Sequence, residues 1–286
     1  MRLRVHHRTE YVYSQPVTES VNELRLYPAN TRWQSCESSY ISVLPATRLC
    51  HYEDLHLNRV HRFEVPHSHD RLVVSSRATV LTRGKVDFGN LPYGSLHKDL
   101  PECHHREECH PYLQDSTFVA RTPEAWRLAL DVQDGSEDVF QTSYAMMEHI
   151  YREYRYVSGA TDVSTHASEV MERRIGVCQD FAHVMVAMCR AIGIPARYVS
   201  GYFFDATHDN SLRGSQASHA WVEVYLDRFG WIGLDPTNNK VIDETYIVLA
   251  TGRDYRDVAP VAGMYFGGGE SRLVVSVAVS RLEGET

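Results

Sequence analysis

A single segment in the second half of the chain restricts the possible fold more than any other. Along residues 178–192, apolar side chains recur at steps of three and four, which predicts an amphipathic helix. Gly193 ends this helix, and Pro195 prevents it from continuing. Segments with a period of two follow at 196–204, 218–226 and 231–234 and predict strands. A helix followed by an antiparallel sheet indicates an α+β domain.

The N-terminal part has a different pattern. Between Arg2 and Thr82, short segments of alternating polarity are separated by turn residues, which is typical of an antiparallel all-β module. We expect strands at 9–13, 23–27, 40–44 and 72–76. Residues 84–120 show little periodicity, and a helical pattern begins at 140–154. The chain is therefore expected to have two parts. These are residues 1–110, a β-rich domain with a connecting region, and residues 111–286, an α+β domain to which the C-terminal segment 273–279 adds a strand.

Charge and hydropathy exclude several classes of partner. The formal net charge is −8, with both signs interspersed along the chain, which argues against nucleic acid and against an anionic membrane. The basic residues 1–7 are not followed by an apolar segment, so no signal peptide is predicted, and the apolar runs are too short to span a membrane. A cytoplasmic location is expected, whereas the oligomeric state stays open.

Cys178 differs in position from the other five cysteines. All six are expected to be free thiols, most of them in packed positions. A turn that begins at Gly176 delivers Cys178 to the first turn of the predicted helix. Unpaired backbone N–H groups and the positive end of the helix dipole favour a thiolate there. The same N–H groups could bind the oxyanion that forms when the thiolate attacks a carbonyl. Cys178 is therefore a candidate nucleophile.

A thiolate nucleophile requires a base, and the base requires a group that orients it. His219 begins one predicted strand, and Asp235 ends the next. Their roles would be to accept the thiol proton and to hold the imidazole ring in the required tautomer. In an antiparallel pair, an even loop around 227–230 would place Asp235 on the opposite face from His219. We therefore predict an odd loop or a β-bulge, with Gly230 or Gly233 in the unusual conformation.

The segments that carry these residues resemble a known family. The segments Gly176-Val177-Cys178-Gln179-Asp180, Ser218-His219-Ala220-Trp221 and Gly233-Leu234-Asp235-Pro236-Thr237 are similar to the core of the transglutaminase-like superfamily. The opening segment 11–28 and the tail 252–261 resemble its bacterial branch with an N-terminal β domain. The resemblance implies a papain-like core, in which a helix bearing Cys178 packs on an antiparallel sheet bearing His219 and Asp235. One departure is that segment 53–59 lacks the glycine expected in an Asp-x-x-Gly-Asn turn.

Four further residues are candidates for lining the substrate cleft, and they are Tyr198, Tyr202, Trp221 and Asp254. Trp221 is two residues from His219 and so shares its strand face, where it could shield the site from water. His183 is expected to be a packed histidine that pairs with Asp180 at a spacing of three.

No metal or other cofactor is predicted. The Cys103–His110 segment contains cysteines and histidines, but its Cys-x5-Cys spacing is not a usual zinc pattern. Residues 205–210 lack the order of ligands found in calcium loops.

We expect a cysteine-nucleophile enzyme that acts on amide bonds of a protein or peptide through a thioester. Hydrolysis, as in a peptidase or amidase, is favoured because the resemblance is to bacterial members regarded as cysteine proteases. Two alternatives remain. The thioester could be resolved by an amine, as in a protein-glutamine transglutaminase, or the chain could be a non-catalytic module that binds proteins.

Overall fold

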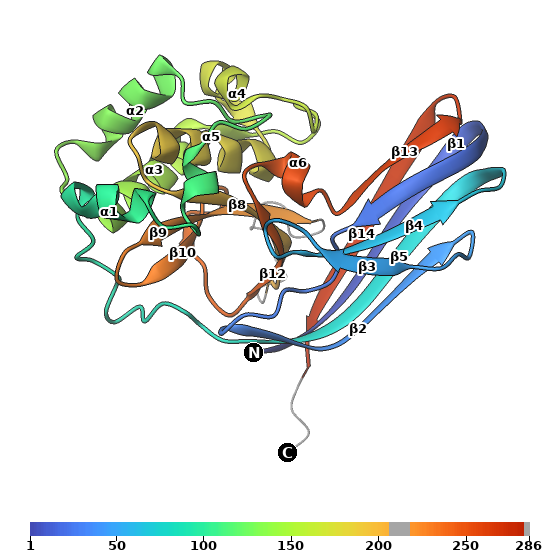
Figure 1. Cartoon of the computed structure of the whole chain (residues 1–286). Coiled ribbons are helices and arrows are strands. Elements are labelled where there is room, and N and C mark those ends of the chain that lie inside the picture. Colours follow the sequence, from blue (N-terminus) through green and yellow to red (C-terminus); the bar gives the residue numbers. More distant parts are fainter. Residues whose placement is uncertain (206–217, 283–286) are drawn as a thin grey trace.

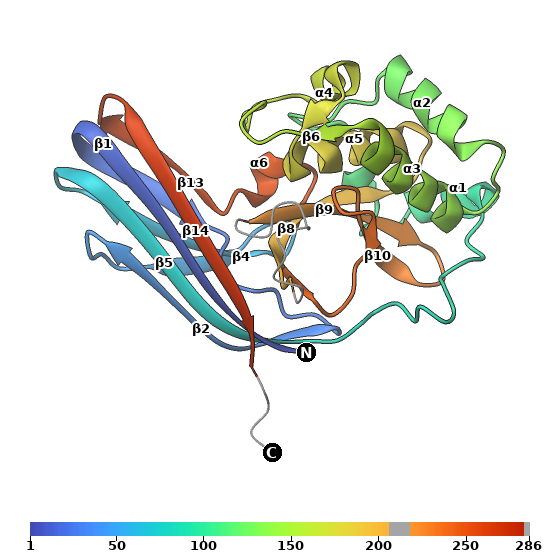
Figure 2. The same cartoon turned by 180° about the vertical axis from the view of Figure 1, so that it is seen from behind.

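The computed structural model describes residues 1–205 and 218–282. It contains a large antiparallel sheet that stands beside an α+β body, and the two meet near the helix labelled α6 (Figures 1 and 2). This arrangement confirms the predicted α+β class with an N-terminal antiparallel region.

The large sheet is built around one long strand, β1. Its seven strands are β1 (Arg2–Leu24), β2 (Gln34–Leu44), β3 (Cys50–Glu53), β4 (Arg59–Val65), β5 (His69–Thr82), β13 (Val261–Gly267) and β14 (Ser271–Arg281). Side chains of β1 alternate between buried and exposed from Arg2 to Thr9, as a period of two requires. All partners of β1 are antiparallel.

The C-terminal strand lies elsewhere than expected. We placed 273–279 in the second domain, but β14 pairs with residues 3–13 of β1 and so belongs to the N-terminal sheet. β13 pairs with the other half of β1, at residues 17–24. The physical reason is the length of β1, because its two halves can each pair with a different strand. The chain returns after α6, and β13 and β14 pair with these two halves. The sheet therefore combines both ends of the described chain (Figure 2).

The turn at residues 54–58 lacks the expected glycine, and a leucine takes the left-handed backbone conformation in its place. Leu57 occupies the position with a positive φ of 63°, and its side chain is 82% exposed. The Asp54 carboxylate accepts hydrogen bonds from the backbone N–H groups of His56 and Asn58, both at 2.9 Å. These bonds hold the turn although a leucine is strained in this conformation.

The second body has a five-stranded antiparallel sheet in the order β11-β10-β9-β8-β12. Its strands are β8 (Ala196–Phe203), β9 (His219–Leu226), β10 (Gly230–Asp235), β11 (Lys240–Val241) and β12 (Tyr246–Gly252). The helices are α1 (Leu100–His104), α2 (Pro123–Gln133), α3 (Val139–Glu153), α4 (Ala167–Arg173), α5 (Cys178–Ala191) and α6 (Tyr255–Val258). Two 3-10 turns, His97–Asp99 and His110–Leu113, and a short parallel pair, β6 (Arg155–Tyr156) with β7 (Ile175–Gly176), complete it.

Helix α5 is the centre of this body. Its bounds match the prediction, but every residue from Gln179 to Arg190 is buried, so it has no solvent face. One side packs on β8 and β9, and α2, α3 and α4 cover the rest (Figure 1). The buried Arg190 guanidinium donates to the backbone carbonyls of Tyr112, Gln114, Ala196 and Arg253. A buried charge of this kind is stabilised because each of the three guanidinium nitrogens donates to at least one carbonyl oxygen.

Side-chain amides of the N-terminal sheet satisfy the free edge of β12. Gln34 exchanges two hydrogen bonds of 2.8 Å with the backbone of Val248, and Asn58 does the same with Thr251. Backbone groups at a sheet edge must be paired when they are buried. The two bodies are thus joined by hydrogen bonds that imitate an additional strand. Among the described residues, no helix is long and apolar enough to cross a membrane.

Candidate active site

Cys178 is the first residue of α5, and its side chain is partly buried. The turn before it is held by Asp180, whose Oδ2 accepts hydrogen bonds from the backbone N–H of Val177 at 2.7 Å and from Thr161 Oγ1 at 2.6 Å. Gly176 is required here, because a Cβ at this position would lie 2.7 Å from the Asp180 side chain. The glycine and the aspartate on either side of Cys178 therefore fix the start of the helix.

His219 and Asp235 form a buried pair. His219 Nε2 lies 2.7 Å from Asp235 Oδ2, and neither side chain is accessible to solvent. Oδ2 also accepts from Tyr246 Oη and Asn238 Nδ2, both at 2.9 Å, while Oδ1 accepts from the backbone N–H of Thr237 at 2.8 Å. Asp235 is therefore surrounded by donors, which fix its position and favour its charged form.

The pKa values of this pair shift in opposite directions. Burial alone would lower the pKa of His219, but the charge and hydrogen bond of Asp235, together with the nearby Cys178 thiol, raise it to about 10. Burial alone would raise the pKa of Asp235, but His219, Asn238 and Tyr246 lower it. At neutral pH the ring is an imidazolium facing a carboxylate.

The second ring nitrogen of His219 is available to the thiol. Nε2 bonds Asp235, which leaves the buried Nδ1 for the thiol, and a side-chain hydrogen bond with Cys178 is among the causes that raise the His219 pKa. Cys178 lies close enough for its thiol to contribute to the His219 pKa. The structure therefore brings the three predicted residues together, with His219 between the other two.

The hairpin that carries His219 and Asp235 has the predicted odd loop. Leu226 pairs with Gly230, which leaves the three residues 227–229 between them, and Gly230 has a φ of 70°. Glu223 pairs with Gly233, so the register continues to place Asp235 opposite Trp221, on the face of His219. The predicted odd loop is therefore confirmed, and Gly230 is the glycine that adopts the positive φ.

The structure separates the four cleft candidates. Tyr198 is buried beside Cys178, and burial followed by the Cys178 charge raises the pKa of its hydroxyl well above the usual value. Trp221 is fully buried, and its ring centre lies 6.2 Å from that of His219, a position consistent with the predicted shielding of the pair from solvent.

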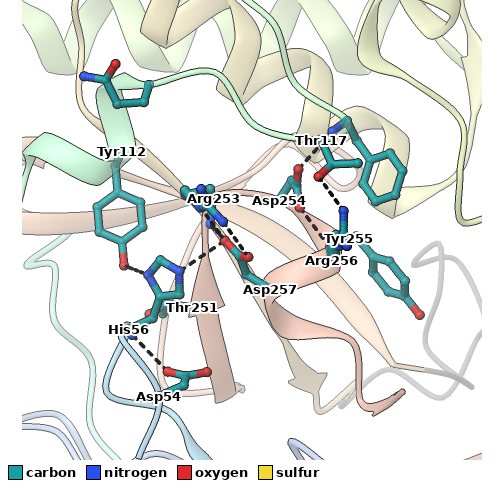
Figure 3. Close-up of polar contacts among 12 residues, drawn as sticks. Asp54, His56, Tyr112, Thr117, Thr251, Arg253, Asp254, Tyr255, Arg256 and Asp257 are labelled. Atoms are coloured by element: carbon teal, nitrogen blue, oxygen red, sulfur yellow. Dashed lines mark hydrogen bonds and ion pairs between the residues drawn. The ribbon is translucent and has the colours of Figure 1, made fainter. Parts of the chain in front are cut away.

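The other two candidates have structural roles. Asp254 is buried and caps α6 through the backbone N–H of Arg256 (Figure 3). It also accepts a hydrogen bond from the backbone N–H of Phe118. Tyr202 was expected in the cleft, but its hydroxyl lies 2.8 Å from His7 Nδ1 in the core of the N-terminal sheet. The expectation for Tyr202 is wrong because β8 extends past α5, so that its last residues pack against β1.

His183 is packed as expected, but its predicted partner is wrong. Its Nε2 accepts a hydrogen bond from the backbone N–H of Tyr255 at 3.1 Å, while Asp180 is engaged by Val177 and Thr161. Burial lowers the pKa of His183 to about 4, so the ring is neutral. A neutral ring suits an acceptor of a backbone N–H.

The side chains of the Cys103–His110 segment point to different partners. His104 Nε2 lies 2.8 Å from the Gly193 carbonyl oxygen, whereas Glu108 accepts from the Tyr225 hydroxyl. In residues 1–205 and 218–282, no group of three or more histidine, cysteine or acidic side chains is placed to hold a metal. Of the 205–210 segment, all but Asp205 lies outside the described residues.

Sequence reasoning missed two residues of the site. Asn238 could have been found, because it follows Asp235 by three residues in a turn, where a side-chain amide can reach back. Tyr246 gives no such signal, because it lies on a different strand, β12, and reaches Asp235 only through the folding of the sheet.

Comparisons with known proteins agree with this geometry. Residues 127–236 match the family model described as the transglutaminase-like superfamily, and residues 3–81 match the bacterial transglutaminase-like N-terminal region. An uncharacterized protein of Mycobacterium leprae is 34% identical over 98% of this chain and 99% of its own length. An uncharacterized protein of Mycobacterium tuberculosis is also 34% identical, over 99% of this chain and 94% of its own length.

Two better-described proteins are also similar. The protein-glutamine gamma-glutamyltransferase of Pseudomonas aeruginosa is 30% identical over 106 residues, which are 35% of this chain and 16% of that protein. The crystal structure of a protein from Cytophaga hutchinsonii, named as a candidate cysteine protease, superposes with a TM-score of 0.79 at 24% identity. It covers 100% of this chain and 92% of that one, which shows a common fold.

Proposed function

Because this chain belongs to the transglutaminase-like superfamily, we propose that it is an enzyme in which Cys178 attacks an amide carbonyl of a protein or peptide. His219 is the acid–base group in this proposal, and Asp235 orients and stabilises it. The observation that carries the proposal is the solvent-inaccessible His219–Asp235 pair next to the partly exposed Cys178 at a helix start.

In this proposal His219 accepts the proton of the Cys178 thiol. The raised pKa of His219, about 10, favours the protonated ring at neutral pH. The thiolate attacks the amide carbon, and the imidazolium then gives its proton to the departing amine or ammonia. This leaves a thioester on Cys178 and a neutral imidazole, which accepts a proton from the next nucleophile. Backbone N–H groups at the start of α5 would bind the oxyanion of each tetrahedral intermediate.

We propose that water resolves the thioester, which makes the reaction a hydrolysis. Support comes from the resemblance to the bacterial branch regarded as cysteine proteases, and the name of the Cytophaga hutchinsonii protein is consistent with it. The alternative is transfer to an amine, which the partial match to the Pseudomonas aeruginosa gamma-glutamyltransferase keeps open.

One experiment separates these outcomes. Casein is incubated with the enzyme with and without dansylcadaverine, while ammonia, new peptide N-termini and incorporated dansyl groups are measured. Hydrolysis gives ammonia or new N-termini at the same rate with and without the amine. Product that forms only with the amine would contradict hydrolysis and identify a transglutaminase.

The same experiment tests the enzyme against a non-catalytic binding module. Cys178→Ala should abolish every product, because it removes the nucleophile. A mass-spectrometric search for acyl groups on Cys178 after incubation with cell lysate extends the test to unknown substrates. Absence of both turnover and acylation in the wild-type protein would favour the binding module.

A further inference from the structure

The last strand of the large sheet has one long edge that no other strand covers. β14 has 11 residues and pairs along its whole length with residues 3–13 of β1. Among the described residues, no strand pairs with its other edge, and β14 lies at the margin of the sheet (Figure 2). Backbone N–H and C=O groups of alternate residues point away from β1 at such an edge. They can therefore pair with a further strand.

Apolar side chains on the core side of β14 are exposed at this edge. Val275 pairs with Thr9 of β1, and directly paired residues point to the same side of a sheet. Thr9 is 2% exposed, whereas Val275 is 40% exposed. Leu273, two residues away and so on the same side, is 53% exposed. A strand added at the free edge would cover part of both side chains.

The other edges of the same sheet have features that oppose the addition of a strand. β2 contains a bulge between Cys36 and Ser38, where the charged Glu37 lies. β3 has only 4 residues, and the pairing of β13 with β1 contains a register shift. Bulges, charges and short strands are the means by which proteins protect exposed edges. β14 lacks them, because its register with β1 is unbroken and residues 273–279 contain no charge and no proline.

The pattern of polar and apolar residues in β14 is the same in both directions. Its sequence is Ser-Arg-Leu-Val-Val-Ser-Val-Ala-Val-Ser-Arg, with Ser276 at the centre. Two copies that pair antiparallel about a twofold axis at Ser276 keep their core sides on the same side of the joined sheet. Every apolar residue then faces an apolar residue, in the pairs Leu273–Val279, Val274–Ala278 and Val275–Val277.

The charges of β14 are compatible with the same register. Arg272 would lie opposite Ser280 of the second copy, and Arg281 would lie opposite Ser271. No two like charges are then directly opposite each other, an arrangement that would be destabilising. The strand is therefore complementary to a second copy of itself in backbone pairing, in apolar side chains and in charge.

We propose that two copies of this chain pair antiparallel along β14, with the twofold axis at Ser276, and so join their N-terminal sheets into one continuous sheet. A second copy fits this edge because it brings a strand of the same pattern, with its own free edge and its own exposed valines. The dimer does not depend on the reaction proposed for Cys178.

Sedimentation equilibrium of the wild-type protein and of two charge variants tests the proposal. The wild type should be a dimer at micromolar concentrations. Ser276→Lys places two ammonium groups directly opposite each other across the axis. It should raise the dissociation constant of the dimer severalfold, and by more at low ionic strength. Ser276→Glu should do the same, whereas Ser38→Lys, at an exposed position of the opposite edge strand β2, should leave the dimer unchanged.

Mixing the two charge variants tests the position of the axis. Ser276→Lys and Ser276→Glu should form a heterodimer in excess of its statistical share, because opposite charges then meet at the axis, and native mass spectrometry measures this share. Circular dichroism melting curves check that both variants are folded. A wild type that stays monomeric would overturn the proposal. Dimers that are insensitive to both substitutions, or folded variants that form no excess of heterodimer, would also overturn it.

Discussion

Asp235 illustrates how much a single buried carboxylate can determine. It receives hydrogen bonds from His219, Tyr246, Asn238 and the backbone of Thr237, and its shifted pKa keeps it charged. It can therefore hold the His219 ring in one orientation and stabilise its positive charge. Among these contacts, sequence reasoning found His219, because a strand–turn–strand pattern restricts which residues can meet. It could not find Tyr246, whose contact depends on the order of strands in the sheet.

Asp235→Asn should lower amide turnover roughly 10²–10⁴-fold while the protein stays folded. The variant no longer holds His219 in the required tautomer or stabilises its positive charge, but the groups that bind the oxyanion remain. Activity against casein and circular dichroism melting curves check this. Cys178→Ala serves as the fully inactive reference. A melted Asp235→Asn variant would instead assign Asp235 a purely structural role.

Leu57→Gly should stabilise the protein by about 1 kcal/mol, because a leucine at a φ of 63° is strained and a glycine is not. The 82% exposed side chain gives up little buried surface when it is removed. Urea unfolding measures the change. Leu55→Gly is the matched control, since Leu55 is 99% exposed in the same turn without a positive φ, and it should be neutral or destabilising. Equal effects of both substitutions would contradict the strain.

At the scale of the elements, local patterns predicted most of the second body. The bounds of α5 and the approximate positions of α3, β8, β9 and β10 follow from periodicity, glycine and proline. The loop between β9 and β10 followed from a functional requirement, namely that Asp235 must face His219. The burial of α5 on all sides could not be predicted, because it depends on α2, α3 and α4, which pack from elsewhere in the chain.

Gly230→Ala tests the β9–β10 hairpin. It should destabilise the protein by about 1–2 kcal/mol, since a Cβ at this position meets no atom within 4 Å and the cost is therefore conformational. Thermal or urea unfolding gives the measurement. Phe229→Ala, at an exposed position of the same loop, should change stability less. An unaffected Gly230→Ala variant would show that the odd loop does not need this glycine.

The whole molecule is a single assembly of the two bodies, and here local patterns were least informative. β13 and β14 return to β1 from the far end of the chain, and side-chain amides of Gln34 and Asn58 complete the edge of β12. Figure 3 shows a further link, in which His56 lies between the Tyr112 hydroxyl and the Asp257 carboxylate. Such long-range pairings leave no periodic signal in the sequence.

Asp257→Asn tests the contribution of this link. Burial alone would raise the pKa of Asp257, but the hydrogen bonds from His56 and Arg253 lower it. A carboxyl group with a lowered pKa stabilises the fold above its unfolded pKa of about 3.9, and the stabilisation is lost as the pH falls toward the folded value. The wild type should therefore exceed Asp257→Asn in unfolding free energy by a constant amount from pH 7 to about 5, and by less below about pH 4.

Urea unfolding at several pH values measures this difference, with the exposed Asp131→Asn of α2 as the control. A difference between the wild type and Asp257→Asn that does not change with pH would contradict a lowered pKa of Asp257, to which both His56 and Arg253 contribute.

The rate at which iodoacetamide alkylates each cysteine of the folded protein tests the central claim most directly. Exposure alone favours Cys50, which is exposed, over Cys178, which is partly buried, and burial raises the pKa of Cys109 and of Cys189 to about 12. At pH 6, where free thiols with a pKa of about 8.5 are almost entirely protonated, the account predicts that Cys178 reacts fastest. It also predicts that His219→Ala removes this advantage. If Cys178 reacts no faster than Cys50 at pH 6, or if His219→Ala leaves its rate unchanged, then Cys178 is not the activated nucleophile.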